Sequence, residues 1–278
     1  MSIGVIASLL AAGVAAGFTA GLVGVGGGVI IVPLLYFFYA HPAWSGAHVA
    51  PSLQAVVSHA TSLLVIVPTT VTGMVAYQRA RLVAWRAALP LAAGAVVAAV
   101  AGAELAPHLP AELLKVLFAG VLLYSAFRLV LRRTRAGQAH ERVALPFLLV
   151  SGLGIGLVSS LLGVGGGIVA IPVLIHLVGL EIRKVAATSI AIIVFTALAG
   201  VVTYMVAGVP AGTVMPPGSV GYVDVAAAVP ILIASALAAP MGAKVNQGLD
   251  TRALRTLFAV LFMALALYLI VRNAPRLF

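Results

Sequence analysis

Two glycine-rich motifs stand out as residues whose type and spacing could do chemistry. Residues 17–33 read GFTAGLVGVGGGVIIVP, and residues 156–172 read GLVSSLLGVGGGIVAIP. Glycine readily adopts a positive φ and leaves backbone N–H groups uncovered, and an apolar segment that could begin a helix follows each motif. Because helix N-termini attract anions, we expect an anion-binding site lined by Gly24, Gly26, Gly27, Gly28, Gly163, Gly165, Gly166 and Gly167.

The same glycines could instead serve helix packing or nucleotide binding. Small residues let membrane helices cross closely, and this packing role alone would account for a single motif. A nucleotide-binding loop is excluded, because no Lys-Ser or Lys-Thr pair follows either motif. Repetition of the motif at a constant offset of 139 residues favours the anion site over packing alone.

Polar side chains in the long segments that follow could complete such a site. Ser52 and Gln54 lie in the first half, and Thr188 and Ser189 lie in the second. Neutral donors suit a weakly hydrated oxyanion that must also be released. The alternative is that these side chains only bond carbonyls of their own helix. Aligning 50–52 with 187–189 makes Ser52 the counterpart of Ser189 and leaves the first half without the threonine.

His59 is the candidate for proton coupling. It lies seven residues after Ser52, so in one continuous helix the two would share a face. Imidazole titrates near physiological pH. The alternative is a neutral, hydrogen-bonded histidine of the core.

The composition places the chain in a lipid bilayer. Of its 278 residues, 63% are hydrophobic and 8% are charged, whereas a soluble domain has about 25% charged residues. There is no cysteine, so disulfides and thiolate metal sites are excluded, and we expect neither a metal nor a cofactor. All six acidic residues lie near segment ends or loops, which argues against a cation substrate. The net charge of +10 comes from short basic loops, which indicates topology signals and lipid contacts, not nucleic acid.

The chain divides into two homologous halves, 1–138 and 139–278. The apolar segments of the two halves lie near 3–23, 29–40, 51–78, 87–106 and 113–131, and near 145–162, 168–180, 186–207, 223–243 and 253–271. We therefore expect an all-α integral membrane protein with about eight to ten transmembrane segments. The segments directly after the glycines are too short for an ordinary span, which predicts broken or re-entrant helices.

The basic loops predict the orientation of the two halves. Cytoplasmic loops are enriched in Lys and Arg, so we expect loops 79–86, 132–142, 181–184 and 244–255 to lie on the cytoplasmic side of the cell membrane. The long segment 51–78 then runs inward and its counterpart 186–207 runs outward. The halves would be inverted-topology repeats, an architecture of secondary transporters that bind substrate near the midplane.

The duplicated GLVGVGGGVIIVP and SLLGVGGGIVAIP resemble the motifs of the TauE/SafE family, also called the toluene sulfonate uptake permease family. The resemblance covers nearly the whole chain. It implies a multi-pass membrane protein that moves sulfite, organosulfonates or related sulfur-containing anions, often as an exporter. The family's small-Thr-Ser motif matches Ala187, Thr188 and Ser189.

Taken together, the sequence predicts a secondary transporter, an exporter of a small sulfur-containing anion that works by alternating access, with protons as a candidate coupling ion. A passive anion channel could use the same glycine site and is the main alternative. A membrane enzyme is disfavoured, because the chain has neither an HExxH motif nor paired midplane carboxylates. A non-transporting membrane assembly factor is a further alternative. The sequence does not determine the oligomeric state.

Overall fold

The structure is a computed structural model that describes residues 3–41, 49–131, 144–210, 213–248, 263–264, 266–267 and 271. The basic linker 132–142 and almost all of the segment predicted at 253–271 therefore lie outside the described residues.

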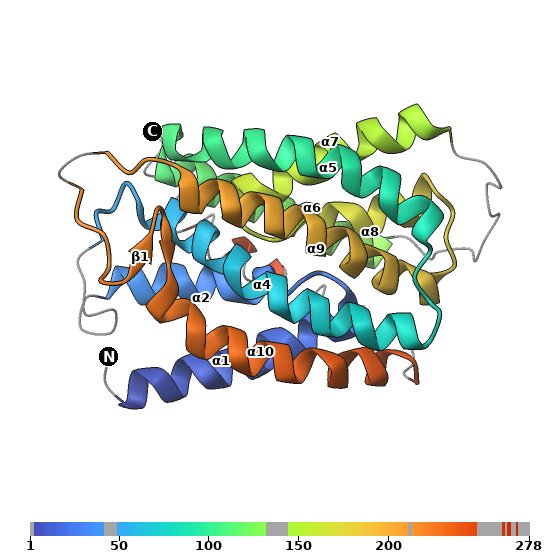
Figure 1. The fold of residues 1–278 in the computed structure, drawn as a ribbon, viewed down its shortest axis with the longest axis horizontal. Helices are drawn as coiled ribbons and strands as arrows, with labels where there is room; N and C mark the ends of the chain where they lie inside the picture. The colour runs from blue at the N-terminus through green and yellow to red at the C-terminus, as the bar shows by residue number, and fades with distance from the viewer. Residues whose placement is uncertain are drawn as a thin grey trace.

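Helices make up nearly all of the described chain (Figure 1). They are α1 (Ile3–Val23), α2 (Gly28–Ala40), α4 (Gln54–Arg79), α5 (Trp85–Leu105), the 3-10 turn η1 (Ala106–His108), α6 (Ala111–Leu131), α7 (Leu145–Leu162), α8 (Gly167–His176), α9 (Ile182–Val206) and α10 (Val225–Asn246). The strands β1 (Ser219–Val220) and β2 (Val223–Asp224) form one short antiparallel hairpin. The predicted apolar segments from 3–23 to 223–243 thus correspond to helices.

Six helices of the described chain are long and apolar enough to cross a membrane, and they include α1, α4 and α9. Large apolar side chains face outward from them, such as Leu237, which is 72% exposed. An apolar outer surface of this kind belongs in lipid. The chain is an all-α, multi-pass membrane protein, as the composition predicts.

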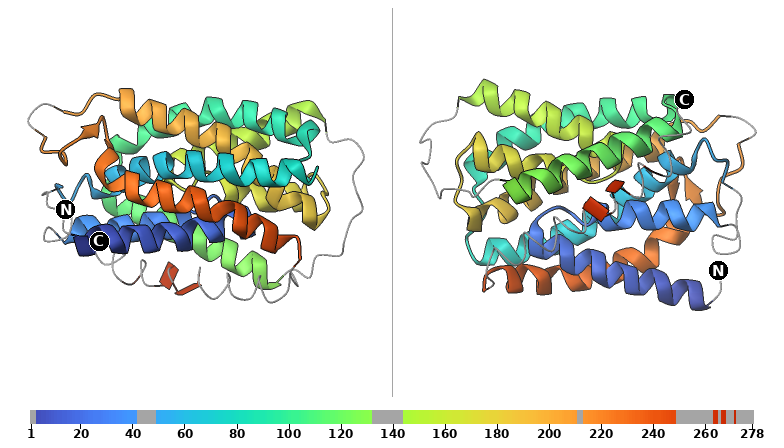
Figure 2. Two further views of the ribbon diagram at one scale, coloured as in Figure 1. Left: turned by 60° about the horizontal axis from the view of Figure 1, so that its bottom comes forward. Right: turned by 180° about the vertical axis from the view of Figure 1, so that it is seen from behind.

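Helices α4 and α9 pack against each other at the centre of the bundle. In the most apolar 18-residue stretch of each helix, 72% of the residues of α4 and 78% of those of α9 are buried, whereas only 33% are buried in α1. Helices α5 and α10 pack against this central pair, as the views from several sides show (Figure 2). The two segments that carry the predicted polar side chains are therefore shielded from lipid.

Helices from one half pack closely on helices from the other. Helix α1 lies along α10, and α7 lies along α5. A Cβ atom placed on Gly17 would lie 2.2 Å from the Ser235 carbonyl oxygen, and one placed on Gly156 would lie 1.9 Å from that of Ala95. Both interfaces are thus backbone-to-backbone contacts that only glycine allows.

Corresponding helices run in opposite directions along the bundle. Helix α4 begins at the end where α1 begins, whereas α7 and α9 begin at the other end (Figure 1). The α4–α5 turn, the starts of α7 and α9 and the end of α10 lie together at one end of the bundle. The β1–β2 hairpin lies at the opposite end.

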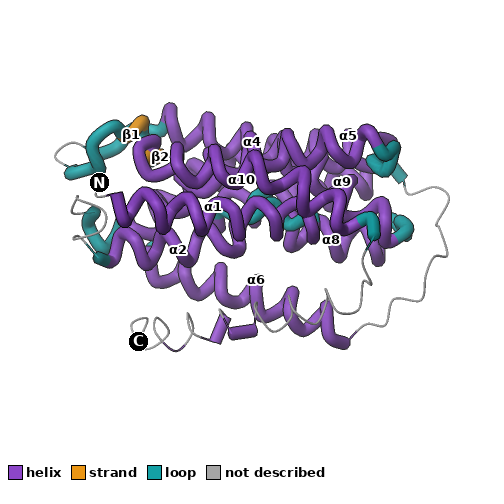
Figure 3. The backbone as a smooth tube through the Cα atoms, turned by 90° about the horizontal axis from the view of Figure 1, so that it is seen from below, coloured by secondary structure: helices purple, strands orange, loops and turns teal. Residues whose placement is uncertain are grey.

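The two short helices begin inside the bundle. Helix α2 has 13 residues and α8 has 10, too few to cross a bilayer at 1.5 Å per residue. Helix α2 runs back toward the end at which α1 begins (Figure 3). Each glycine motif is therefore the point where the chain turns around within the protein.

Candidate anion site

The glycine motifs adopt the backbone conformation that the sequence predicts. Gly24, Gly26 and Gly27 have φ values of 81°, 87° and 81°, and the matching glycines 163, 165 and 166 have values of 64°, 75° and 84°. Such left-handed conformations are strained for residues with a side chain. They end α1 and α7 and allow α2 and α8 to begin immediately, at Gly28 and Gly167.

The structure brings the two motifs into direct contact. A Cβ atom placed on Gly28 would lie 2.6 Å from the Cα atom of Val164, and one placed on Gly167 would lie 2.7 Å from the Cα atom of Val25. The expected meeting of two helix N-termini is therefore present. Neither Gly28 nor Gly167 can carry a side chain without moving the other motif.

Six glycine amides at this meeting point have no acceptor within the described part of the chain. They belong to Gly26, Gly27, Gly28, Gly165, Gly166 and Gly167, all of which are buried. The first amide of α2 to find a partner is that of Ile30, 3.0 Å from the Gly27 carbonyl oxygen. Buried amides are nearly always paired. Donors that converge at two helix N-termini can be satisfied by an anion or by water.

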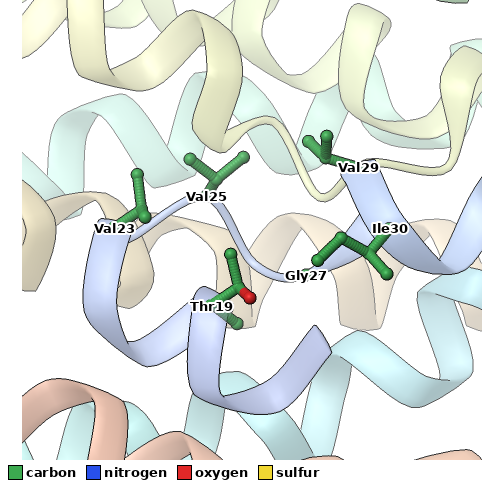
Figure 4. A pocket seen from close by; sticks show the side chains of 7 residues that line it. Thr19, Val23, Val25, Gly27, Val29 and Ile30 are labelled. Atoms are coloured by element: carbon green, nitrogen blue, oxygen red, sulfur yellow. The ribbon is translucent and has the colours of Figure 1, made fainter. Parts of the chain in front are cut away.

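A small pocket lies beside the first motif (Figure 4). Its lining is Thr19, Ala20, Val23, Val25, Gly27, Val29 and Ile30. The only side-chain hydroxyl in this lining belongs to Thr19, and it donates to the Ala15 carbonyl of its own helix. The pocket is therefore apolar apart from the backbone of Gly27.

Two serines fix the glycine motifs from the opposite half. Ser62 Oγ donates to the Gly163 carbonyl oxygen at 2.8 Å, and Ser189 Oγ donates to that of Gly24 at 2.7 Å. These matching bonds make Ser62 the counterpart of Ser189, so the expected pairing of Ser52 with Ser189 is wrong. Helix α2 and the α2–α4 connection are both longer than α8 and the α8–α9 connection, and the offset between the halves changes from 139 at the glycine motifs to 127 residues at these serines.

With this register the Ala-Thr-Ser motif is complete in both halves, at 60–62 and 187–189. The expected absence of a threonine from the first half is therefore also wrong. Thr61 Oγ1 accepts a hydrogen bond from the Asp224 amide, and Thr188 Oγ1 accepts one from the Ala84 amide, both at 3.0 Å. Each threonine thus holds the chain just before α10 or α5.

The two remaining polar residues predicted in the first half lie at the start of α4. Ser52 is exposed in the turn before the helix, which begins at Gln54, so it does not share a helical face with His59 as expected. Gln54 Nε2 donates to the Tyr39 and Val49 carbonyls at 3.2 and 3.4 Å. These bonds tie α4 to the end of α2 and not to a glycine motif.

His59 lies beside the second glycine motif. A Cβ atom placed on Gly163 would lie 2.4 Å from the His59 Cα atom. Its fully buried ring is hydrogen-bonded through Nε2 to the Tyr36 hydroxyl and lies 6.4 Å, centroid to centroid, from Phe118. Nδ1 has no partner in the described chain. Lys115 Nζ lies 5.7 Å from the centroid of the Tyr36 ring, so a cationic group is close by.

Sequence reasoning missed the burial of Asp224. It caps α10 by accepting from the Ala227 amide at 3.0 Å, and the Tyr39 hydroxyl donates to its other oxygen at 3.0 Å. An aspartate directly before a long apolar run is an N-cap signal, which could have revealed this role. Its described bonds are those of a structural cap.

Comparison with known proteins agrees with this architecture. The apolar helices of this chain define a multi-pass membrane protein. The family model for the sulfite exporter TauE/SafE matches residues 9–269, and the chain belongs to this family.

Two relatives carry the description of a probable membrane transporter protein. One, from Haemophilus influenzae, is 27% identical over 258 residues, which cover 93% of this chain and 95% of the relative. The other, from Methanocaldococcus jannaschii, is 29% identical over 125 residues, 45% of each chain. No solved structure matches the chain.

The serine bonds to the glycine motifs generate a prediction about stability. Ser62→Ala should lower the free energy of unfolding by about 1–3 kcal/mol, because it leaves the buried Gly163 carbonyl without its donor. Ser58→Ala is the matched control, since Ser58 is equally buried but bonds the Gln54 carbonyl of its own helix at 2.6 Å. It should cost less than about 1 kcal/mol. Denaturant unfolding in detergent measures both, and equal losses would contradict the fixing role of Ser62.

Proposed function

We propose that the protein is a secondary transporter that exports a small sulfur-containing anion, such as sulfite or an organosulfonate. The observation that carries this proposal is the pair of abutting helix N-termini with six buried amides that lack an acceptor in the described chain. The family description, sulfite exporter, supports the substrate class. The site functions as a binding centre and not as an enzyme active site.

A site made of neutral donors suits transport. Backbone amides and helix dipoles attract an anion without a buried Lys or Arg, whose charge would make release slow. A sulfur oxyanion presents several oxygens and can accept from both motifs at once. Of the eight motif glycines predicted as ligands, the six whose amides lack an acceptor can donate to the anion, because the amides of Gly24 and Gly163 are bonded to the Ala20 and Ser159 carbonyls. Thr188 keeps its hydroxyl proton for the anion, whereas Ser189 uses its proton on the Gly24 carbonyl and positions that motif.

We further propose that 1–138 and 139–278 are inverted repeats that work by alternating access. The matching bonds of Ser62 and Ser189, and the matching close approaches at Gly17 and Gly156, support a twofold relation between the halves. Opposite helix directions support inversion. The anion would stay at the glycine motifs while the surrounding helices rock from one side to the other.

In this proposal the end of the bundle that holds the α4–α5 turn, the start of α9 and the end of α10 faces the cytoplasm. The basic loops 79–86, 132–142, 181–184 and 244–255 are then proposed to be cytoplasmic. Because the chain has no cysteine, single cysteines can test the orientation without background. A cysteine at exposed Ala80 should react with an impermeant maleimide only from the cytoplasmic side, and one at exposed Val214 only from the outside. The opposite pattern would contradict the orientation.

Transport by reconstituted protein tests the function. Solid-supported-membrane electrophysiology should give a saturable current with sulfite, thiosulfate or sulfoacetate, but not with chloride. Gly166→Val should abolish it, because the side chain strains a backbone at φ 84° and fills the site. Gly154→Val on α7 is the control, since a Cβ atom there meets nothing within 4 Å.

Electroneutral exchange would give no current, and radiolabelled sulfite uptake covers that case. A passive channel would transport sulfite without counterflow, so trans-stimulated tracer exchange separates it from a transporter. No flux of any sulfur anion in either assay would contradict the proposed function.

His59 is proposed to couple transport to protons. A proton bound by His59, beside Gly163, would add a positive charge to the anion site, so wild-type transport should rise as the assay pH is lowered from about 8. Methanesulfonate is the suitable probe, because the charge of a sulfonate does not change over this range, whereas sulfite takes up a proton and becomes bisulfite. His59→Gln should flatten the profile. If the variant keeps the wild-type pH dependence, His59 does not carry the proton.

A further inference from the structure

The two glycine motifs share a backbone conformation but differ in the side chains beside them. On the last turn of α7, the Cβ atom of Ser159 lies 3.2 Å from the position of a Cβ atom on Gly166. At the corresponding position on α1, the Cβ atom of Ala20 lies 3.4 Å from that of Gly27. One motif therefore has a hydroxyl beside it where the other has a methyl group.

The Ser159 hydroxyl is buried and has no hydrogen-bond partner in the described chain. Among the serines that the structure describes, only Ser219 in the β1–β2 hairpin shares this property. The adjacent Ser160 donates to the Gly156 carbonyl at 3.3 Å, and Ser58 donates to that of Gln54. A buried hydroxyl without a partner is destabilising, so its position beside Gly166 calls for an external one.

Every group around Gly166 that lacks a hydrogen-bond partner can act as a donor, so what is missing is an acceptor. The amides of Gly165, Gly166 and Gly167 are donors without an acceptor in the described chain, and the Ser159 hydroxyl can also donate. Several donors that await an acceptor define a place for an oxyanion. The donors come from both the backbone and a side chain, so they can reach different oxygens of one anion.

The first motif offers no comparable side chain among the residues described. Beside Gly27 lies the apolar pocket, in which the hydroxyl of Thr19 is already bonded to its own helix (Figure 4). The contrast extends to the other side of each motif. A Cβ atom on Gly24 would meet the Cα atom of Ala186 at 2.6 Å, whereas Gly163 lies against His59, whose Nδ1 also lacks a partner.

We propose that the oxyanion binds asymmetrically, mainly at the Gly163–Gly167 motif, and that Ser159 is its side-chain ligand. The Gly24–Gly28 motif lies on the other side of the bound anion and offers it backbone amides and an apolar flank, but no side-chain donor. This inference rests on the proposed function and narrows its substrate class. An anion with several directional acceptor oxygens gains from the hydroxyl, whereas a spherical halide gains less.

Sulfite transport by reconstituted variants tests the role of Ser159. Ser159→Ala should raise the KM for sulfite about tenfold or more, as expected for the loss of a hydrogen bond to a charged group. Ser159→Cys replaces the hydroxyl by a larger thiol, which is a weaker donor, and its KM should lie between those of the alanine variant and wild type. Ser160→Ala, the control on the same turn, should leave the KM within about twofold of wild type, because the Ser160 hydroxyl bonds its own helix.

The reverse substitution tests the asymmetry. Ala20→Ser creates the same hydroxyl beside Gly27 and should leave the KM for sulfite nearly unchanged. Size-exclusion chromatography and thermal unfolding verify that each variant is folded, and a folded Ser159→Cys replaces Ser159→Ala if the latter is not.

The possible outcomes separate this inference from the proposed function. If wild-type protein transports sulfite and the Ser159 variants match Ser160→Ala, the inference is wrong and the proposed function stands. If Ala20→Ser lowers the KM about tenfold, the gain equals the contribution expected of Ser159. The anion would then bind both motifs alike, and the proposal of asymmetric binding would be wrong. If wild-type protein moves no sulfur anion, the proposed function fails and this inference fails with it.

Discussion

A backbone amide inside a membrane protein must find an acceptor, and this constraint governs the centre of the structure. In lipid no water is at hand to satisfy a donor. The two glycine motifs nevertheless gather, at one buried point, six amides without an acceptor in the described chain. The protein keeps these groups open at an energetic cost, which an anion bound there would offset. The glycines, the short helices and the polar side chains around them all serve this arrangement.

The scaffold holds the motifs by bonds that pass between the halves. Ser62 of the first half holds Gly163, and Ser189 of the second half holds Gly24. Helices α1 and α10, and likewise α5 and α7, are packed backbone to backbone. The parts that move in an alternating-access cycle would therefore each combine helices from both halves.

Much of this structure follows from local sequence signals. The helix boundaries, the positive φ angles of the glycines and the start of α2 and α8 directly after them depend on apolar segment length and on glycine itself. The correspondence of Ser62 to Ser189 and the burial of Asp224 do not follow from local sequence signals. Mainly because α2 and the α2–α4 connection are both longer than their counterparts, the Ala-Thr-Ser motif lies 12 residues further along the first half, and the nearer Ala50-Pro51-Ser52 gave a false match.

The contact between the two motifs and the lone hydroxyl of Ser159 depend on packing between residues more than a hundred positions apart. The hydrophobic periodicity within one segment does not predict such a contact. Repetition of the glycine motif indicated that the two motifs act together. That Ser159 stands where the first half has Ala20 could be interpreted only from the structure, which places these residues beside Gly166 and Gly27.

The most direct test of the anion site is an experimental structure of the protein with a bound sulfur oxyanion, determined by cryo-electron microscopy in lipid nanodiscs saturated with sulfite. We predict density for the anion at the amides of the Gly163–Gly167 motif, within hydrogen-bond distance of Ser159 and covered by the Gly24–Gly28 motif. Density only among the basic residues at the end of the bundle, with the glycine motifs closed on each other and empty, would contradict this prediction.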